Sequence, residues 1–239
     1  MKIITWNLNH RTIEKPIPEG VLVFITDSNP DVIVLTEFVD GKSREYFKET
    51  LAELGYSYQL LSSKVGKQNQ VFIASKFEFA KGVSVAPNIT SPAETNYLHV
   101  FLPRQELNII GFRAPSYKTS KERKAYWKQL AGIASSISKK NTIFLGDINY
   151  DPFTGISAFS TEIEFSLAGT YKIPNPEGEW SFISIDGKNK TRIDHAILSE
   201  SLKLKRAEYI TAFNGIVLAG SKNDSAITDH AVLSVELEI

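Results

Sequence analysis

Short apolar runs, rich in β-branched and aromatic residues, alternate with polar stretches along the whole chain. Runs of this kind predict strands. Two of them, residues 33–35 and 143–145, are apolar at every position, which is typical of strands covered on both faces. The predicted strands are residues 2–5, 32–36, 70–75, 83–86, 97–102, 107–112, 142–145, 192–198 and 231–238.

Three longer segments carry helical signals and lie between groups of these strands: residues 20–28, 43–54 and 120–137. Pro30 limits the first, because proline disfavours a helical conformation in the residue before it. Ser43 and Ser120 are suited to N-cap the second and the third. Helices separated by several strands indicate an α/β protein in which two packed sheets lie between outer helices. We expect one domain that spans residues 1–239.

Composition narrows the possible functions. The 239 residues include 27 Lys and Arg and 27 Asp and Glu, so the zero net charge argues against a strongly basic nucleic-acid coat or a polybasic membrane anchor. The chain has no cysteine, which excludes disulfides, thiolate zinc sites and cysteine nucleophiles. No apolar stretch has the length of a membrane span, and polar residues soon follow Met1, so we expect a cytoplasmic protein without membrane contact.

Acids, amides and histidines gather at the ends of five predicted strands. Each has an ordinary explanation when taken alone, for example Glu37 as a solvated strand-end acid or residues 146–149 as a polar turn. The same chemical bias at several strand ends instead predicts a shared site at the rim of the core. The strand-end residues are Asn7, Glu37, Asp147, Asn149, Asp194, His195, Asp229 and His230.

The four acids of this group would repel one another unless a cation lay among them. Oxygen ligands without thiolates favour a hard ion, so we expect Mg²⁺, with Mn²⁺ as a substitute. Mg²⁺ usually takes only one or two protein carboxylates, which leaves other acids free to orient a water molecule or a histidine. A metal, an oriented water and a carboxylate-supported histidine together match phosphoester hydrolysis.

The motifs that carry these residues resemble the endonuclease/exonuclease/phosphatase superfamily, which includes DNase I-like nucleases, exonuclease III-type AP endonucleases, neutral sphingomyelinases and inositol polyphosphate 5-phosphatases. They occur in family order as residues 4–7, 29–37, 146–149, 192–198 and 228–230, with a weaker match at 70–76. The resemblance implies a four-layer α/β/β/α sandwich of the DNase I-like type. It also implies a site where the two sheets open at one end.

The resemblance implies a role for each matching residue. Glu37 is similar to the principal Mg²⁺ ligand, Asn7 to the amide near the metal and the scissile phosphate, and Asp229 to a further residue of the metal environment.

The remaining residues of the motifs resemble the family's catalytic groups. Asp147 would orient or deprotonate the attacking water, and Asn149 would bind a phosphate oxygen. His230 would stabilise charge on the phosphoryl oxygens, while Asp194 would hold the His230 imidazole in its useful tautomer. His195 is interpreted as structural.

The loop after the strand at 107–112 departs from the family pattern. Many members carry a His or Tyr there, whereas alignment on Pro115 places Arg113 at this position. A guanidinium can grip phosphate oxygens in bidentate fashion but cannot be deprotonated. Tyr117 could supply a phenol instead, and an exposed strand-end charge is the alternative interpretation of Arg113.

Three further residues are candidates for substrate binding. Trp180 could stack on a base or pack in the core. Asn9 and Arg11 add polar and cationic groups to the same rim. A basic run between Lys118 and Lys124 could touch a phosphate backbone, although it is more typical of a solvated helix face.

These observations predict a Mg²⁺-dependent phosphodiesterase that acts on nucleic acid, with DNA as the first expectation, either as an endonuclease or as an exonuclease. The alternative substrate is a phospholipid, an inositol phosphate or another small phosphodiester, and the lack of a hydrophobic hairpin weighs against a lipid. A binding module without catalysis is a third possibility, which the complete set of acids disfavours. We expect a monomer with no obligate protein partner.

Overall fold

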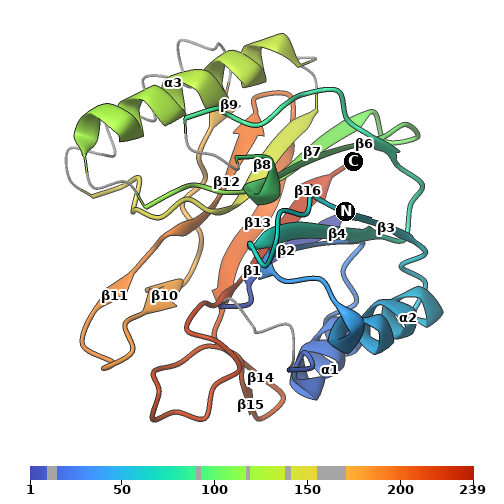
Figure 1. Ribbon diagram of the computed structural model, residues 1–239, viewed down its shortest axis with the longest axis vertical. Coiled ribbons are helices and arrows are strands. Elements are labelled where there is room, and N and C mark those ends of the chain that lie inside the picture. Colours follow the sequence, from blue (N-terminus) through green and yellow to red (C-terminus); the bar gives the residue numbers. More distant parts are fainter. Residues whose placement is uncertain (10–14, 90–92, 117–118, 138–140, 155–170) are drawn as a thin grey trace.

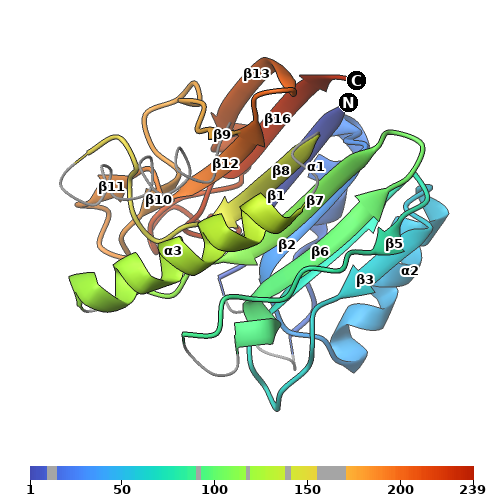
Figure 2. The ribbon, with the colours of Figure 1, turned by 90° about the horizontal axis from the view of Figure 1, so that it is seen from above.

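The computed structural model of the chain describes residues 1–9, 15–89, 93–116, 119–137, 141–154 and 171–239. Two six-stranded mixed sheets pack face to face, as Figure 1 shows. Helices α1 (Glu19–Ser28) and α2 (Glu45–Glu53) cover the outer face of the first sheet, and α3 (Ser120–Ser136) lies across the outer face of the second (Figure 2). This arrangement confirms the predicted four-layer α/β/β/α sandwich.

The first sheet has the strand order β13-β16-β1-β2-β4-β3. Only β1 and β2 are parallel, and α1 connects them on the outer face. The strands are β1 (Lys2–Asn7), β2 (Val32–Phe38), β3 (Tyr58–Leu61), β4 (Gln70–Ser75), β13 (Lys203–Ile210) and β16 (Val232–Glu238).

The second sheet repeats this plan with the order β5-β6-β7-β8-β12-β9, in which β7 and β8 form the parallel pair and α3 connects them. The strands are β5 (Ala80–Lys81), β6 (Tyr97–Leu102), β7 (Leu107–Arg113), β8 (Thr142–Asp147), β9 (Tyr171–Lys172) and β12 (Asp194–Ser199). The smaller elements are η1 (Lys42–Arg44), η2 (Ala93–Asn96) and two hairpins, β10 (Phe182–Ile183) with β11 (Lys190–Thr191) and β14 (Ala212–Phe213) with β15 (Ile216–Val217).

Buried apolar side chains form three layers of core. The central layer fills the space between the sheets and includes Val34, Ile73 and Ile109. The two outer layers lie beneath α1 and α2 and beneath α3. Because β2 and β8 have apolar layers on both faces, their residues are buried at consecutive positions, as the continuous apolar runs predicted.

The strand predicted at residues 83–86 is wrong. The chain leaves the edge of the second sheet after β5, and Val83 and Val85 are 94% and 75% exposed. Two β-branched residues, Val83 and Val85, do not form a strand when no apolar surface is available to bury them. The N-cap of the third helix is Thr119 and not Ser120, because the Thr119 side chain accepts a hydrogen bond from the Glu122 N–H.

Among the described residues, no helix combines the length and the apolar composition that a membrane span needs.

Candidate active site

The two parallel strand pairs bring four polar side chains to one rim of the sandwich. Asn7 ends β1 and Glu37 lies near the end of β2, while Arg113 ends β7 and Asp147 ends β8. The Asn7 amide donates from Nδ2 to Asp147 Oδ2 at 3.0 Å and to Glu37 Oε1 at 3.3 Å. The two sheets therefore share one polar site at the carboxyl ends of their parallel strands.

A local irregularity in β2 directs Glu37 into this site. The pairing of β2 with β4 shifts register between Leu35 and Phe38, and Glu37 has the left-handed φ of 52°. Bulges of this kind re-aim a side chain, and a left-handed backbone at a residue other than glycine costs roughly 1–3 kcal/mol. The fold thus maintains a strained backbone that places Glu37 at the rim.

Arg113 lies between the two carboxylates. Its Nε is 2.8 Å from Glu37 Oε1 and 3.5 Å from Asp147 Oδ2. The first contact is an ion pair whose angles are not those of a hydrogen bond. Arg113 is therefore neither an isolated strand-end charge nor a group held away from the acids.

Asp147 is clamped by its own loop. The preceding Gly146 has φ 146°, and a Cβ there would lie 1.9 Å from the Phe112 carbonyl oxygen, so only glycine fits this approach of β8 to β7. The Asn149 N–H donates to Asp147 Oδ1 at 2.8 Å, which closes an Asx turn. Asn149 has the left-handed φ of 58°, which asparagine tolerates better than most residues.

His230 and Asp194 form a buried pair beside Asp147. His230 Nδ1 is 2.9 Å from Asp194 Oδ2, and both side chains are almost fully buried. Asp194 pairs directly with Asp147 across β12 and β8, which fixes the spacing of the two acids. His230 Nε2 is directed away from Asp194 and lies 3.9 Å from Asp229 Oδ1.

Burial and neighbouring charge shift the pKa values of this group. Burial lowers the pKa of His230, but the Asp194 carboxylate more than offsets this and the pKa is raised to about 9. Burial raises the pKa of Asp147, against the opposing charge of His230. Burial also raises the pKa of Asp229, where His230 opposes the rise and Glu37 adds to it. The acids and the imidazole therefore act as one electrostatic unit.

Glu37, Asp229 and Asn7 provide the oxygen atoms that a hard cation would use. Glu37 Oε2 makes no hydrogen bond to the described residues, since both contacts are to Oε1. Asn7 Oδ1 accepts one hydrogen bond, from the Asn9 N–H at 2.8 Å. In the part of the chain that the structure describes, no three His, Cys, Asp or Glu side chains converge as a metal cage. The donor set fits Mg²⁺, which keeps several waters and takes one or two protein carboxylates.

The candidate substrate-binding residues fall in different places. Asn9 is exposed and lines a cavity of about 320 Å³ together with Asp229. Trp180 packs against the core between the sheets, with the Lys190 ammonium 5.3 Å from its ring. Arg11 and Tyr117 lie outside the described residues.

His195 is fully buried and lies on β12 beside Asp194. Its ring contacts Tyr209 and Phe153, and burial lowers its pKa to about 4. The surroundings are those of a neutral packed imidazole, in keeping with its structural interpretation.

Several supporting residues were not singled out from the sequence. Trp6 Nε1 donates to the His230 carbonyl oxygen at 2.9 Å, and Ser181 Oγ accepts from the Asp194 N–H at 2.9 Å. The Phe182 ring lies 5.0 Å from the His230 ring. Trp6 lies within the motif at residues 4–7, and Ser181 and Phe182 directly follow Trp180. Their positions next to these candidate residues are the sequence feature from which they could have been identified.

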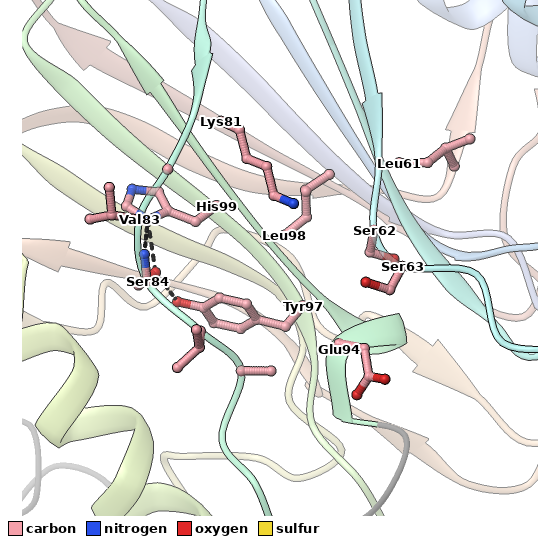
Figure 3. A pocket seen from close by; sticks show the side chains of 13 residues that line it. Leu61, Ser62, Ser63, Lys81, Val83, Ser84, Glu94, Tyr97, Leu98 and His99 are labelled. Carbon is pink, nitrogen blue, oxygen red and sulfur yellow. Dashed lines mark hydrogen bonds between the residues drawn. The ribbon is translucent and has the colours of Figure 1, made fainter.

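A second polar hollow, of about 260 Å³, lies at the edge of the second sheet formed by β5 and β6 (Figure 3). Ser84 Oγ lies 2.7 Å from His99 Nδ1 and 2.6 Å from the Tyr97 hydroxyl, and His99 Nε2 lies 3.0 Å from Asn108 Oδ1. Burial lowers the pKa of His99. These bonds attach the segment after β5 to β6, and none of the residues at the rim takes part.

The profile of the Endonuclease/Exonuclease/phosphatase family matches residues 4–230. Curated protein sequences yielded no match.

Solved structures match over the full chain. An AP endonuclease from Archaeoglobus fulgidus is 17% identical, with all of both chains covered and a TM-score of 0.75. The 3′ phosphatase NExo from Neisseria, solved with a product DNA hairpin, is 16% identical, with all of both chains covered and a TM-score of 0.73. TDP2 from D. rerio, complexed with a single-strand DNA product, is 14% identical, with 100% of this chain and 99% of that chain covered and a TM-score of 0.72. At such identities the likeness shows the fold, which is DNase I-like.

Proposed function

The chain belongs to the Endonuclease/Exonuclease/phosphatase family, and we propose that it is a metal-dependent phosphodiesterase whose substrate is DNA. The family membership confirms the resemblance that the motifs indicated and supports phosphoester hydrolysis. Two structurally similar proteins were solved with product DNA, which favours DNA over a lipid headgroup or an inositol phosphate.

The observation that carries the proposal is the convergence of a clamped carboxylate and a carboxylate-supported imidazole at one rim. Asp147 would orient the attacking water with a carboxylate that Asn7 and Asn149 hold in place. Because Asp194 occupies Nδ1 of His230, Nε2 is the nitrogen left to donate to a phosphoryl oxygen.

Glu37, Asn7 and Asp229 would hold Mg²⁺, for which Mn²⁺ would substitute. When bound, the ion would supply Lewis-acid chemistry that polarises the phosphoryl group. Arg113 contributes a permanent positive charge beside the same acids and can pair with phosphate oxygens. Asn149 would bind a phosphate oxygen from the loop that clamps Asp147.

The test uses a duplex oligonucleotide with nicked, abasic and recessed-end variants, and a small diester, bis(p-nitrophenyl) phosphate. Wild-type protein should hydrolyse the oligonucleotide with Mg²⁺ and stop with EDTA. Asp147→Asn and His230→Ala should each lower kcat by about 10²–10⁴-fold, the usual range for loss of a general acid or base.

Asp186→Asn is the matched control, because Asp186 is an exposed acid whose carboxylate contacts only its own turn. It should retain wild-type activity. Full activity of Asp147→Asn would contradict the assigned site, and turnover of the small diester without any DNA cleavage would contradict the substrate.

A further inference from the structure

A cavity of about 250 Å³ borders the rim on the side of Asn149. The loop after β7, the first turns of α3 and the loop after β8 enclose it, and the residues that supply its polar groups are Ser116, Arg123, Asn149 and Tyr150. Asn149 belongs both to this cavity and to the Asp147 clamp, because its Nδ2 donates to the Ala114 carbonyl oxygen and its N–H to Asp147. The cavity therefore begins within two residues of Asp147.

Arg123 differs from the other cations of the basic run. On α3 it precedes Tyr126 and Trp127 by three and four residues, so it shares the face that packs on the sheet. Lys121, Lys124 and Lys128 are exposed, whereas Arg123 is half-buried at the cavity. The expectation of a solvated helix face holds for those lysines and not for Arg123.

Tyr150 supplies a second, independent observation. Tyr150 lines the cavity, and its hydroxyl is buried without a hydrogen-bond partner among the described residues. Its ring is fixed by edge-on packing against Trp127 at 5.3 Å. A buried hydroxyl without a partner is costly, so a hydrogen-bond acceptor that reaches Tyr150 beside Arg123 would be stabilised.

We propose that this cavity is the subsite for a second phosphate of the substrate, the neighbour of the scissile phosphate on the same strand. The inference rests on the proposed function, because the proposed function places the scissile phosphate at Asn149. Neighbouring phosphates of one strand follow at about 3.4 Å of axial rise, so a polynucleotide held at Asn149 continues into the adjoining hollow. Arg123 pairs with that phosphate and the Tyr150 hydroxyl donates to it. The substrate class is then a polynucleotide strand and not an isolated phosphodiester.

The experiment compares an oligonucleotide with bis(p-nitrophenyl) phosphate, which has one phosphate only. Arg123→Gln should lower kcat/KM for the oligonucleotide by about tenfold or more relative to the small diester, the usual effect of losing a charge-assisted hydrogen bond. It should also reduce the slope of log(kcat/KM) against log salt by about 0.7–0.9. Lys124→Gln removes the same charge from the exposed face of α3 and should leave the substrate ratio as in the wild type.

Tyr150→Phe keeps the proposal testable if Arg123→Gln folds poorly. It should lower oligonucleotide kcat/KM by roughly threefold or more while Tm stays level or rises, because an unpartnered buried hydroxyl is removed. A merely structural hydroxyl would leave the substrate ratio unchanged, and that result would overturn its role.

Failure of the subsite can be told from failure of the proposed function. Fluorescence anisotropy of a labelled oligonucleotide in EDTA measures binding without turnover, and Arg123→Gln should weaken it more than Lys124→Gln does. Equal weakening by both variants, equal losses on both substrates, or no loss at all would overturn the subsite. Absence of hydrolysis by wild-type protein, with binding that still depends on Arg123, would instead count against the proposed chemistry alone.

Discussion

The rim and the hollow each contain a buried histidine. His230 at the rim is 6% exposed, and His99 in the hollow is 4% exposed. Their surroundings are opposite in charge. His230 contacts the Asp194 carboxylate and its pKa is raised to about 9, although burial lowers it. His99 contacts the Ser84 hydroxyl and the Asn108 amide, and burial lowers its pKa with only partial compensation from Asn108.

Burial acts in the same direction on both rings, so the charge of the partner distinguishes the two imidazoles. At the rim the carboxylate keeps a proton on the ring, which suits a group that donates to a phosphate. In the hollow burial lowers the pKa of the ring, and the ring holds a chain segment against the sheet (Figure 3). Three experiments would break or sharpen this comparison.

The largest effect is expected from Asp194→Asn, which gives His230 the neutral amide partner that His99 has. Loss of the carboxylate should lower kcat for DNA cleavage by about 100-fold or more, since the imidazole loses both its proton and its orientation. The reciprocal change, Asn108→Asp, gives His99 a carboxylate and should leave kcat unchanged. An equal loss from both variants would show that general damage to the fold, and not the partner of His230, causes the effect.

Gly82→Ala tests the hollow and should have an intermediate effect. A Cβ at Gly82 would lie 2.1 Å from the His99 ring, which Ser84 and Asn108 hold on both sides. We expect a loss of about 1–3 kcal/mol in the free energy of unfolding, as in other overpacked sites, with kcat unchanged.

Gly132→Ala is the matched control in urea denaturation, because nothing lies within 4 Å of its added Cβ on α3. It should stabilise the protein by about 0.5–1 kcal/mol, the helix-propensity gain of alanine over glycine. If Gly82→Ala is as stable as the wild type, the segment after β5 is not held against His99 as described.

The smallest effect concerns pH. The folded pKa of His99 lies below its ordinary value of 6.5, so below that pH the unfolded chain binds a proton that the folded chain does not. His99 should therefore contribute less to stability as pH falls from 7 to 5. The gap in unfolding free energy between wild type and His99→Gln, measured in urea at both pH values, should narrow at pH 5. A gap that widens would mean that the folded ring gains a proton more readily than a free one.

The sequence was informative where burial is continuous along the chain. Strands such as β2 and β8 lie between two apolar layers, so they are apolar at consecutive positions. These apolar runs could be identified as strands without knowledge of the neighbouring elements. The edge strand β13 was missed because its outward positions carry Lys and Arg, and the stretch at 83–86 was taken for a strand although it has no apolar surface to cover it. Whether a segment forms an edge strand depends on the elements that pack beside it, and the local sequence pattern does not contain this information.

The residue types at the ends of the apolar strands are determined by the sequence alone. They were sufficient to predict the family, the layered fold and the candidate acids. Tertiary structure decided how these groups meet. The bulge that turns Glu37 toward Arg113, the neutral partners of His99 and the position of Arg123 at a cavity beside Asn149 all join residues far apart along the chain. The physical reason is that strand patterns follow from local burial, whereas charge pairing and the pKa values that it sets depend on distances that only the packed sheets determine.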